Sequence, residues 1–224
     1  MRMKILFLRV GIDRGCGGRL SPLFESGAFE YVPIPENQDL VDPDRGIRYS
    51  DIKARYGETL ASLVRNDSYA HYDPEFSTLT YGEPSEPKRS QLLRLVCGDR
   101  LVFYAGFQGV GISPGTCFVI GYFVIKAVHA ISEWNEWPPK KFFHLWQNAH
   151  FRRRSERPSL VVVEGCQSQS RLLRMALPLS DHDQLVKPEI SSILGFGGSV
   201  KRAVGRWVPP SYAEGTCSWL DAAS

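Results

Sequence analysis

Four side chains in this sequence have the types that proton transfer or base recognition requires. Asp13 lies in the glycine-rich segment "GIDRGCGG", His71 and Asp73 lie two residues apart in "SYAHYDPEF", and His150 follows Asn148 in "WQNAHF". Carboxylates and imidazoles act as general acids and bases, and they also hydrogen-bond the edges of nucleobases. If the four groups lie within hydrogen-bond reach of one another, the protein is best interpreted as an enzyme.

Each of these residues also has a structural interpretation that involves no chemistry. An ion pair between Asp13 and Arg9 can fix a turn, Asp73 can stabilise the Asp-Pro turn, and a helix dipole favours a histidine such as His150 at a C-terminus. His71 and Asp73 point to the same side if their segment is extended. The residue types alone leave both interpretations open.

The glycine-rich segment follows the apolar run "MKILFL" and precedes a second extended stretch over 28–36. Nucleotide-binding loops of the Rossmann and P-loop types need a helix directly after the glycines, because its N-terminus supplies the positive dipole. Here Pro22 and a short strand follow instead. A wide turn would explain the glycines, but a backbone without side chains also lets a ligand approach closely. We interpret the segment as one wall of a nucleotide or base pocket, with the predicted ligand-binding residues Arg9, Gly11, Asp13, Gly17, Gly18, Ser21 and Tyr104.

The densest basic cluster is "FRRRSERP", which could contact the backbone of a nucleic acid. Such contacts add salt-dependent affinity without sequence information. A net charge of +3 permits a polyanionic partner but does not require one. A solvated turn is the simpler interpretation of the cluster. The predicted backbone-contacting residues are Arg152, Arg153, Arg154 and Arg157.

Cysteine and histidine spacing predicts no metal site, and no cofactor can be named. The chain has five cysteines, in no CxxC pair, and its histidines form no HExxH motif. Cys16 is a weaker nucleophile candidate, because the nearby Arg14 and Arg19 could lower its pKa but no histidine partner is evident. No apolar stretch approaches 18 residues and no signal-peptide pattern appears, so we expect a cytoplasmic protein without a membrane partner.

Hydrophobic patterning predicts runs of strands rather than alternating strands and helices. We therefore expect an α+β fold with a mixed or antiparallel, barrel-like sheet and about three short helices. We interpret residues 1–224 as a single domain, with a possible subdivision near residue 90. The expected strands are 3–10, 28–36, 101–107, 117–131 with a bulge at Gly121, 159–165 and 171–180, and the expected helices are 50–66, 140–150 and 188–196.

The segment "FLRVGIDRGCGGRLSPLFESGAFEYVPIPE" resembles the opening of the nucleotide-modification-associated domain family, the third set so named. Val10 and Cys16 depart from that family's pattern. The resemblance implies association with systems that modify bases or nucleotides, with nucleic acid, a nucleotide or modification-system proteins as partners. The matching residues are Arg9, Gly11, Asp13, Gly17, Gly18, Ser21, Pro22, Pro33, Ile34, Pro35 and Glu36, with looser matches at His71, Asp73, Pro74, Asn148 and His150.

A weaker likeness, carried by "GDRLVFYAGF" and "FVIGYF", is to PUA-like domains of the ASCH and EVE groups, which bind bases in an aromatic pocket. Two functions follow from these patterns. A non-catalytic reader of modified nucleic acid, which we favour narrowly, predicts an aromatic cage with a basic rim. An enzyme acting on a nucleotide or base, as transferase or hydrolase, predicts convergence of Asp13, His71, Asp73 and His150. A third possibility is a scaffold subunit without a pocket.

Overall fold

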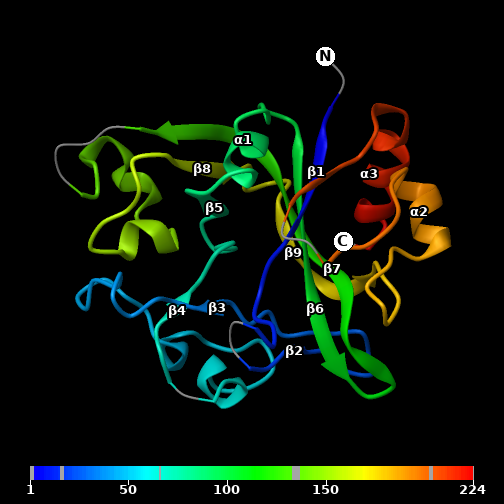
Figure 1. Ribbon diagram of the computed structural model, residues 1–224, viewed down its shortest axis with the longest axis horizontal. Coiled ribbons are helices and arrows are strands. Elements are labelled where there is room, and N and C mark those ends of the chain that lie inside the picture. The colour runs from blue at the N-terminus through cyan, green and yellow to red at the C-terminus, as the bar shows by residue number, and fades with distance from the viewer. Residues whose placement is uncertain (1–2, 16–17, 66, 133–136, 202–203, 224) are drawn as a thin grey trace.

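A large mixed β-sheet forms the centre of the computed structural model, which describes residues 3–15, 18–65, 67–132, 137–201 and 204–223 (Figure 1). Two further strands lie beside the main path of the sheet. β2 (Ser21–Pro22) pairs with β6 (Arg100–Gly109), and β9 (Arg171–Pro178) pairs with β7 (Ile112–Ile131). β1 and β2 run parallel to β6, and the other pairs are antiparallel. The order along the sheet is β10 (Arg206–Trp207), β1 (Ile5–Arg9), β6 (Arg100–Gly109), β7 (Ile112–Ile131), β8 (Leu160–Gly165) and β5 (Thr80–Glu83).

This architecture confirms the α+β class and the mixed sheet, which stays open rather than closing into a barrel over the residues described. Strands from both sides of residue 90 are neighbours, since β1 pairs with β6 and β5 pairs with β8. The single-domain interpretation itself stays a prediction. None of the helices in the described ranges is long and apolar enough to cross a membrane.

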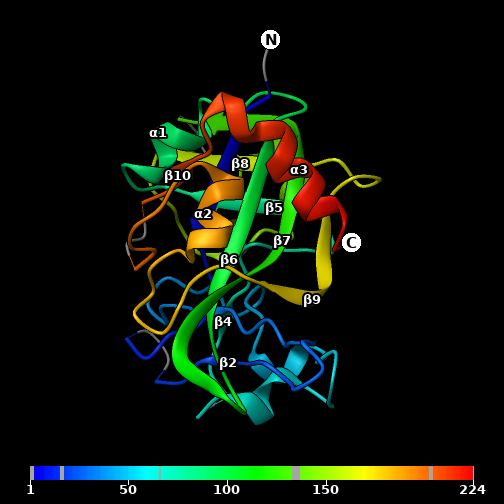
Figure 2. The ribbon, with the colours of Figure 1, turned by 90° about the vertical axis from the view of Figure 1, so that its right-hand side faces the viewer.

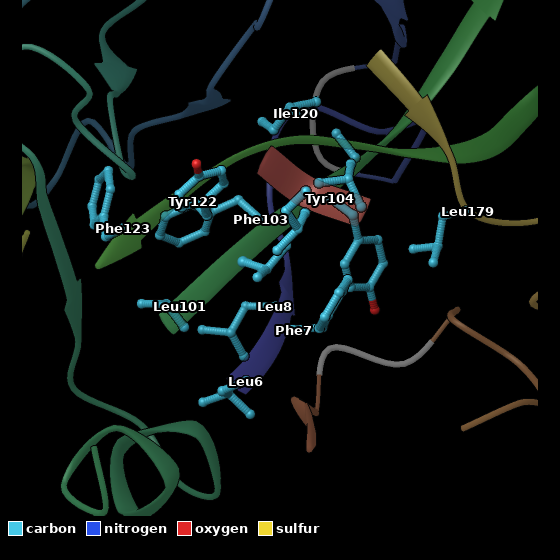
Figure 3. Close-up of a cluster of buried hydrophobic side chains, with 14 of the residues drawn as sticks. Leu6, Phe7, Leu8, Leu101, Phe103, Tyr104, Ile120, Tyr122, Phe123 and Leu179 are labelled. Carbon is cyan, nitrogen blue, oxygen red and sulfur yellow. The ribbon is translucent and has the colours of Figure 1, made fainter. Parts of the chain in front are cut away.

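The core lies where β1 and β6 are neighbours beneath two C-terminal helices. Ile5–Leu8 of β1 are fully buried, which explains why this strand reads as a continuous apolar run rather than an alternating one. Leu6 and Leu8 of β1 lie near Leu101 of β6 in Figure 3. Helices α2 (Pro188–Leu194) and α3 (Ala213–Asp221) cover this part of the sheet, as Figure 2 shows. The segment over 188–196 is therefore helical as predicted.

Strand β7 carries the sheet from this core to the part that holds the candidate site. Its first half pairs with β6 and its second half with β8, and its register against β6 shifts where Phe103 faces Gly121 and Tyr104 faces Val119. A Cβ on Gly121 would lie 2.6 Å from the Arg171 carbonyl oxygen, so glycine is required there. The bulge expected at this glycine is thus present.

Two of the expected helices are wrong. Over 50–66 the chain forms only the 3-10 turns η1 (Tyr49–Asp51) and η2 (Leu60–Leu63), because a bridge between Lys53 and Thr59 closes the intervening segment as a hairpin-like turn. Over 140–150 it forms η3 (Lys140–Leu145) and η4 (Ala149–Arg152), interrupted at Asn148, whose backbone is extended. Tertiary contacts of these segments override their helical periodicity.

Short elements complete the chain between the major strands. Of the strand expected over 28–36, only isolated bridges at Ala28 and Phe29 and the strand β3 form. The predicted strands over 3–10, 101–107, 117–131, 159–165 and 171–180 are all present. The remaining elements are β3 (Ile34–Pro35), β4 (Ala70–His71), α1 (Lys88–Leu92) and η5 (Pro210–Tyr212).

Candidate functional site

A pocket of about 930 Å³ lies between the glycine-rich segment, the β3–β4 pair, β5 and the segment after η4. Arg9 and Asp13 line it from one direction, and Arg153 and Glu156 line it from another. Its walls thus come from parts of the chain that are far apart in sequence. A pocket of this size is large enough for a nucleotide-sized ligand.

His71, Asp73 and His150 converge in this pocket. Asp73 Oδ2 is 4.0 Å from His71 Nε2 and 3.7 Å from His150 Nε2. The two imidazole rings are nearly perpendicular, with centroids 4.8 Å apart. The side chains are only 9%, 2% and 4% exposed, in the order of the sequence. Three of the four groups that the enzyme hypothesis requires therefore lie together.

The backbone of β5 and the turn before η4 hold this cluster in position. The Gly82 N–H donates to both carboxylate oxygens of Asp73, at 3.2 and 2.9 Å. The Asn148 amide donates to Asp73 Oδ1 at 2.9 Å, and its oxygen accepts from the His150 backbone N–H at 3.1 Å. A Cβ on Gly82 would clash with the His150 ring and lie 2.9 Å from Asn148 Oδ1. Gly82 is thus required for the close approach of His150 to Asp73.

Two glutamates hold the outer nitrogens of the two histidines. Glu36 Oε2 lies 2.7 Å from His71 Nδ1, and Glu156 Oε2 lies 2.5 Å from His150 Nδ1. Because an ionised carboxylate only accepts hydrogen bonds, each Nδ1 is the donor, which in a neutral imidazole places the lone pair on Nε2. Both lone pairs belong to the nitrogens nearer Asp73. The pairing of β3 with β4 brings Glu36 to His71, since Ile34 faces His71 across that ladder.

Arg153 lies between the two glutamates and neutralises part of their charge. Its Nε and Nη2 each donate to Glu36 at 2.9 Å, and its Nη1 donates to Glu156 at 2.5 Å. Burial raises the pKa of Glu36, but the hydrogen bond from His71 and the charge of Arg153 outweigh burial and lower it to about 2. The same balance, with His150 in place of His71, lowers the pKa of Glu156 to about 2. Both glutamates are therefore charged at neutral pH.

Burial has the opposite consequence for the inner groups. It raises the pKa of Asp73 well above its usual value, although the hydrogen bonds from Gly82 and Asn148 act in the other direction. It lowers the pKa of His150 to about 4, against the hydrogen bond to Glu156. The low polarity of the site thus disfavours any uncompensated charge on these two groups.

Cationic side chains surround the pocket. Arg9 donates to Gln184 Oε1 at 3.0 Å and to the Lys201 carbonyl oxygen at 3.2 Å, while Lys88 forms an ion pair with Glu83. Arg157 and Lys201 are exposed lining residues. Exposed cations at the rim of a concave site attract anions such as phosphate.

The structure separates the other predicted ligand-binding residues into two groups. Arg9, Gly11 and Asp13 line the pocket, and Asp13 Oδ1 accepts from the Gly15 N–H at 2.8 Å. Ser21 and Tyr104 are buried in the interior and do not line it. Ser21 Oγ accepts from the Val32 N–H at 3.2 Å, and the Tyr104 hydroxyl donates to the Val200 carbonyl oxygen at 3.3 Å. Gly18 is exposed with φ of +70°, whereas Gly17, like Cys16, lies outside the described residues.

The arginine cluster is also divided. Arg152 donates to the carbonyl oxygens of Gln147 and Arg45, and it stacks over Trp146. Arg153 forms ion pairs with Glu36 and Glu156, whereas Arg154 and Arg157 are exposed. Contact of these residues with a nucleic-acid backbone stays a prediction.

Sequence reasoning missed several residues that build the site. Glu36 entered only as a family match, and Gly82 and Glu156 were not identified. The one available signal for Glu156 is that it stands as a single acid within the basic run "FRRRSERP". Nothing in the spacing indicates that Glu36 and Glu156 share Arg153, because that contact joins residues 117 apart in the chain.

Comparison with known proteins assigns the chain to a class. The family model described as nucleotide modification associated domain 3 matches residues 4–210. The protein belongs to this family, which confirms the resemblance seen in its first thirty-odd residues and gives it a nucleotide-modification-associated role. No curated protein and no solved structure matches the chain.

Proposed function

We propose that the protein is an enzyme that acts on a nucleotide or a nucleic-acid base bound in the pocket, as a hydrolase or transferase. The observation that carries this proposal is the convergence of His71, Asp73 and His150 in the pocket. Their inward atoms, two imidazole nitrogens and one carboxylate oxygen, are suited to activating the attacking or reacting group of a substrate.

The composition of the pocket favours catalysis over passive reading. A reader would need an aromatic cage, but among the lining residues in the described part of the chain the one Phe, Tyr or Trp ring is that of Tyr81. The same lining contains two histidines and several carboxylates, including Asp13, Asp73 and Glu156. Clusters of buried ionisable groups in a cleft are typical of active sites.

The substrate class follows from the rim and from the family. Arg9, Arg157 and Lys201 present positive charge suited to a phosphate, while the carboxylate of Asp13 can accept hydrogen bonds from a base. Gly11, whose φ of +82° favours glycine, lines the pocket with its backbone. A nucleotide, either single or within a nucleic acid, combines these features. The nucleotide-modification-associated family supports the same class.

The test is to incubate the purified protein with ribo- and deoxyribonucleotides and with plain and modified oligonucleotides, in the presence of divalent metals, and to measure substrate masses. We expect a mass change that disappears in Asp73→Asn and persists in His182→Ala, a matched control at an exposed histidine. Binding without a mass change, abolished by Asp13→Ala, would support the reader instead. A mass change that persists in both Asp73→Asn and His71→Ala would exclude this cluster as the active site.

A further inference from the structure

We propose that His71 Nε2, His150 Nε2 and Asp73 Oδ2 bind a divalent transition-metal ion. The inference deepens the proposed function, on which its catalytic meaning rests, but metal binding itself can be measured without a substrate. It departs from the expectation drawn from cysteine and histidine spacing, because the three ligands come together only in the folded chain.

The distances between the three ligand atoms are closer to those around a shared metal ion than to those of hydrogen-bonded partners. The three ligand atoms lie within 4.8 Å of one another, and the two histidine–carboxylate separations are 3.7 and 4.0 Å. Hydrogen bonds between nitrogen and oxygen typically span about 2.7–3.2 Å. Ligands around a tetrahedral ion with bonds of about 2.1 Å are separated by roughly 3.4 Å. A small inward movement of the two rings therefore completes the site.

Each ligand is already oriented by a second hydrogen bond on its outer side. Glu36 fixes the ring of His71, Glu156 fixes the ring of His150, and Asn148 holds the other oxygen of Asp73. Metal-binding histidines typically donate their second N–H to a carboxylate in this way, which sets the tautomer and aims the lone pair.

The hydrogen-bond donors to Asp73 do not supply a positive charge. Asp73 is 2% exposed, and its hydrogen-bond donors, the Gly82 N–H and the Asn148 amide, are neutral. The guanidinium of Arg153 is engaged by Glu36 and Glu156. A buried carboxylate needs a counter-charge or a proton. A divalent ion bound at Asp73 Oδ2 would supply that counter-charge.

The ligand set selects the kind of metal. Two imidazoles and one carboxylate suit Fe²⁺, Mn²⁺, Co²⁺ or Zn²⁺, whereas Mg²⁺ and Ca²⁺ prefer oxygen ligands throughout. Three protein ligands would leave coordination positions open for a substrate or water, and all three residues line the pocket. An ion held there would polarise a phosphate or carbonyl oxygen of the substrate, or activate a water molecule.

A second histidine cluster in the described part of the chain supplies a control. His129, His144 and Glu164 also approach one another, with His129 Nε2 3.3 Å from Glu164 Oε2. Lys126 Nζ already lies 2.5 Å from the other oxygen of Glu164, and His144 is exposed. The carboxylate of Glu164 therefore already has a cation beside it, the ammonium of Lys126. This group at the surface is also less enclosed than the cluster of His71, Asp73 and His150.

The experiment is to strip the full chain with a chelator, to titrate it with Co²⁺ and with Zn²⁺, and to measure stoichiometry and affinity by calorimetry and by Co²⁺ absorption. We expect one tight ion per chain, lost at least tenfold in Asp73→Asn and His150→Ala and unchanged in the His129→Ala/His144→Ala double variant. Glu36→Gln is expected to weaken binding roughly ten- to a hundredfold, as outer ligands do elsewhere.

Wild-type protein keeps the proposal testable if a variant fails to fold. Bound Zn²⁺ is expected to protect His71 and His150, but not His182, from diethyl pyrocarbonate, as mapped by mass spectrometry. The absence of saturable binding in the wild type, or binding lost only in the His129→Ala/His144→Ala variant, would overturn the metal site. One bound ion without any change in nucleotide masses would leave the site standing and overturn the proposed function. Full activity of the metal-free protein would support the proposed function and show that the ion has no catalytic role.

Discussion

Arg153 and Glu36 form a two-pronged ion pair, in which Nε and Nη2 each donate to a different carboxylate oxygen at 2.9 Å. The same guanidinium also donates to Glu156. One arginine thus links the β3–β4 pair to the segment after η4, and it indirectly positions both histidines of the candidate site.

Loss of Arg153 is expected to be strongly destabilising. The Arg153→Ala variant leaves Glu36 and Glu156 largely buried without a cation, and removing one partner of such a pair costs about 3–5 kcal/mol. Arg153→Lys restores the charge but not the two-pronged geometry, so it should recover only part of the stability. Chemical denaturation measures the free energies of unfolding. Arg154→Ala, an exposed neighbour, is the matched control and should change stability by less than about 0.5 kcal/mol. Equal effects of the two alanine variants would contradict the role given to Arg153.

Gly82→Ala is expected to disrupt the site through His150. The added methyl group would clash with the ring of His150, and overpacking of this kind costs about 1–3 kcal/mol. Affinity for Co²⁺ should fall together with stability, because His150 must move away from Asp73. Gly215→Ala in α3 is the control, since a Cβ there meets nothing within 4 Å. That variant should be neutral or slightly more stable. Unchanged Co²⁺ affinity in Gly82→Ala would show that His150 does not need its present position.

Acid is expected to destabilise the metal-free protein through Glu36. Its pKa is about 2 in the folded state and near 4.5 in the unfolded chain, so the unfolded state binds more protons as the pH falls between these values. The contribution of Glu36 is fully present above about pH 4.5 and is lost as the pH decreases toward 2. Measuring the free energy of unfolding from pH 7 to pH 3 tests this prediction. The Glu36→Gln variant should show a shallower decline over the same range, and an identical decline would refute the assignment.

Exposed cations at the pocket are expected to contribute to nucleotide affinity. Removal of Arg157 or Lys201 should weaken binding by up to about fivefold, with a smaller effect at high salt, because exposed charge contacts are worth up to about 1 kcal/mol and are screened. Titration of each alanine variant with a nucleoside triphosphate at two salt concentrations provides the measurement. Arg174→Ala removes an exposed arginine of β9 that does not line the pocket. If that variant weakens nucleotide binding equally, the affinity depends on the net charge of the protein rather than on the cations at the pocket.

The sequence predicts best those elements in which apolar residues form long runs or recur at regular spacing. Strands β6, β7 and β8 have this property, and so does α2, which begins with Pro188 and ends before Gly195. The segment over 50–66 has helical periodicity but does not form a helix, since Ser50 is held by Asp67 and a bridge closes between Lys53 and Thr59. Such contacts depend on the folded chain and leave no local signal.

The candidate site was accessible from the sequence to a limited extent. His71, Asp73 and His150 were identified by residue type, and their convergence is a finding of the structure. Ser21 matches the family motif and Tyr104 is an aromatic ring that could stack on a base, but both satisfy their hydroxyl groups inside the core. The roles of Glu36 and Glu156 arise from pairings between distant segments, which one sequence cannot reveal.

The bidentate link between Glu36 and Arg153 has a consequence for the newly made chain. Glu36 leaves the ribosome 117 residues before Arg153, an interval of about 6–23 s at ordinary rates of synthesis. During that interval the acidic groups must remain hydrated, because their buried partner does not yet exist. We therefore expect the β3–β4 pair, which forms a separate two-stranded sheet, to pack stably only after the η4 segment arrives. A nascent chain halted before Arg153 would keep this region sensitive to protease, and it would gain protection in one step when synthesis resumes.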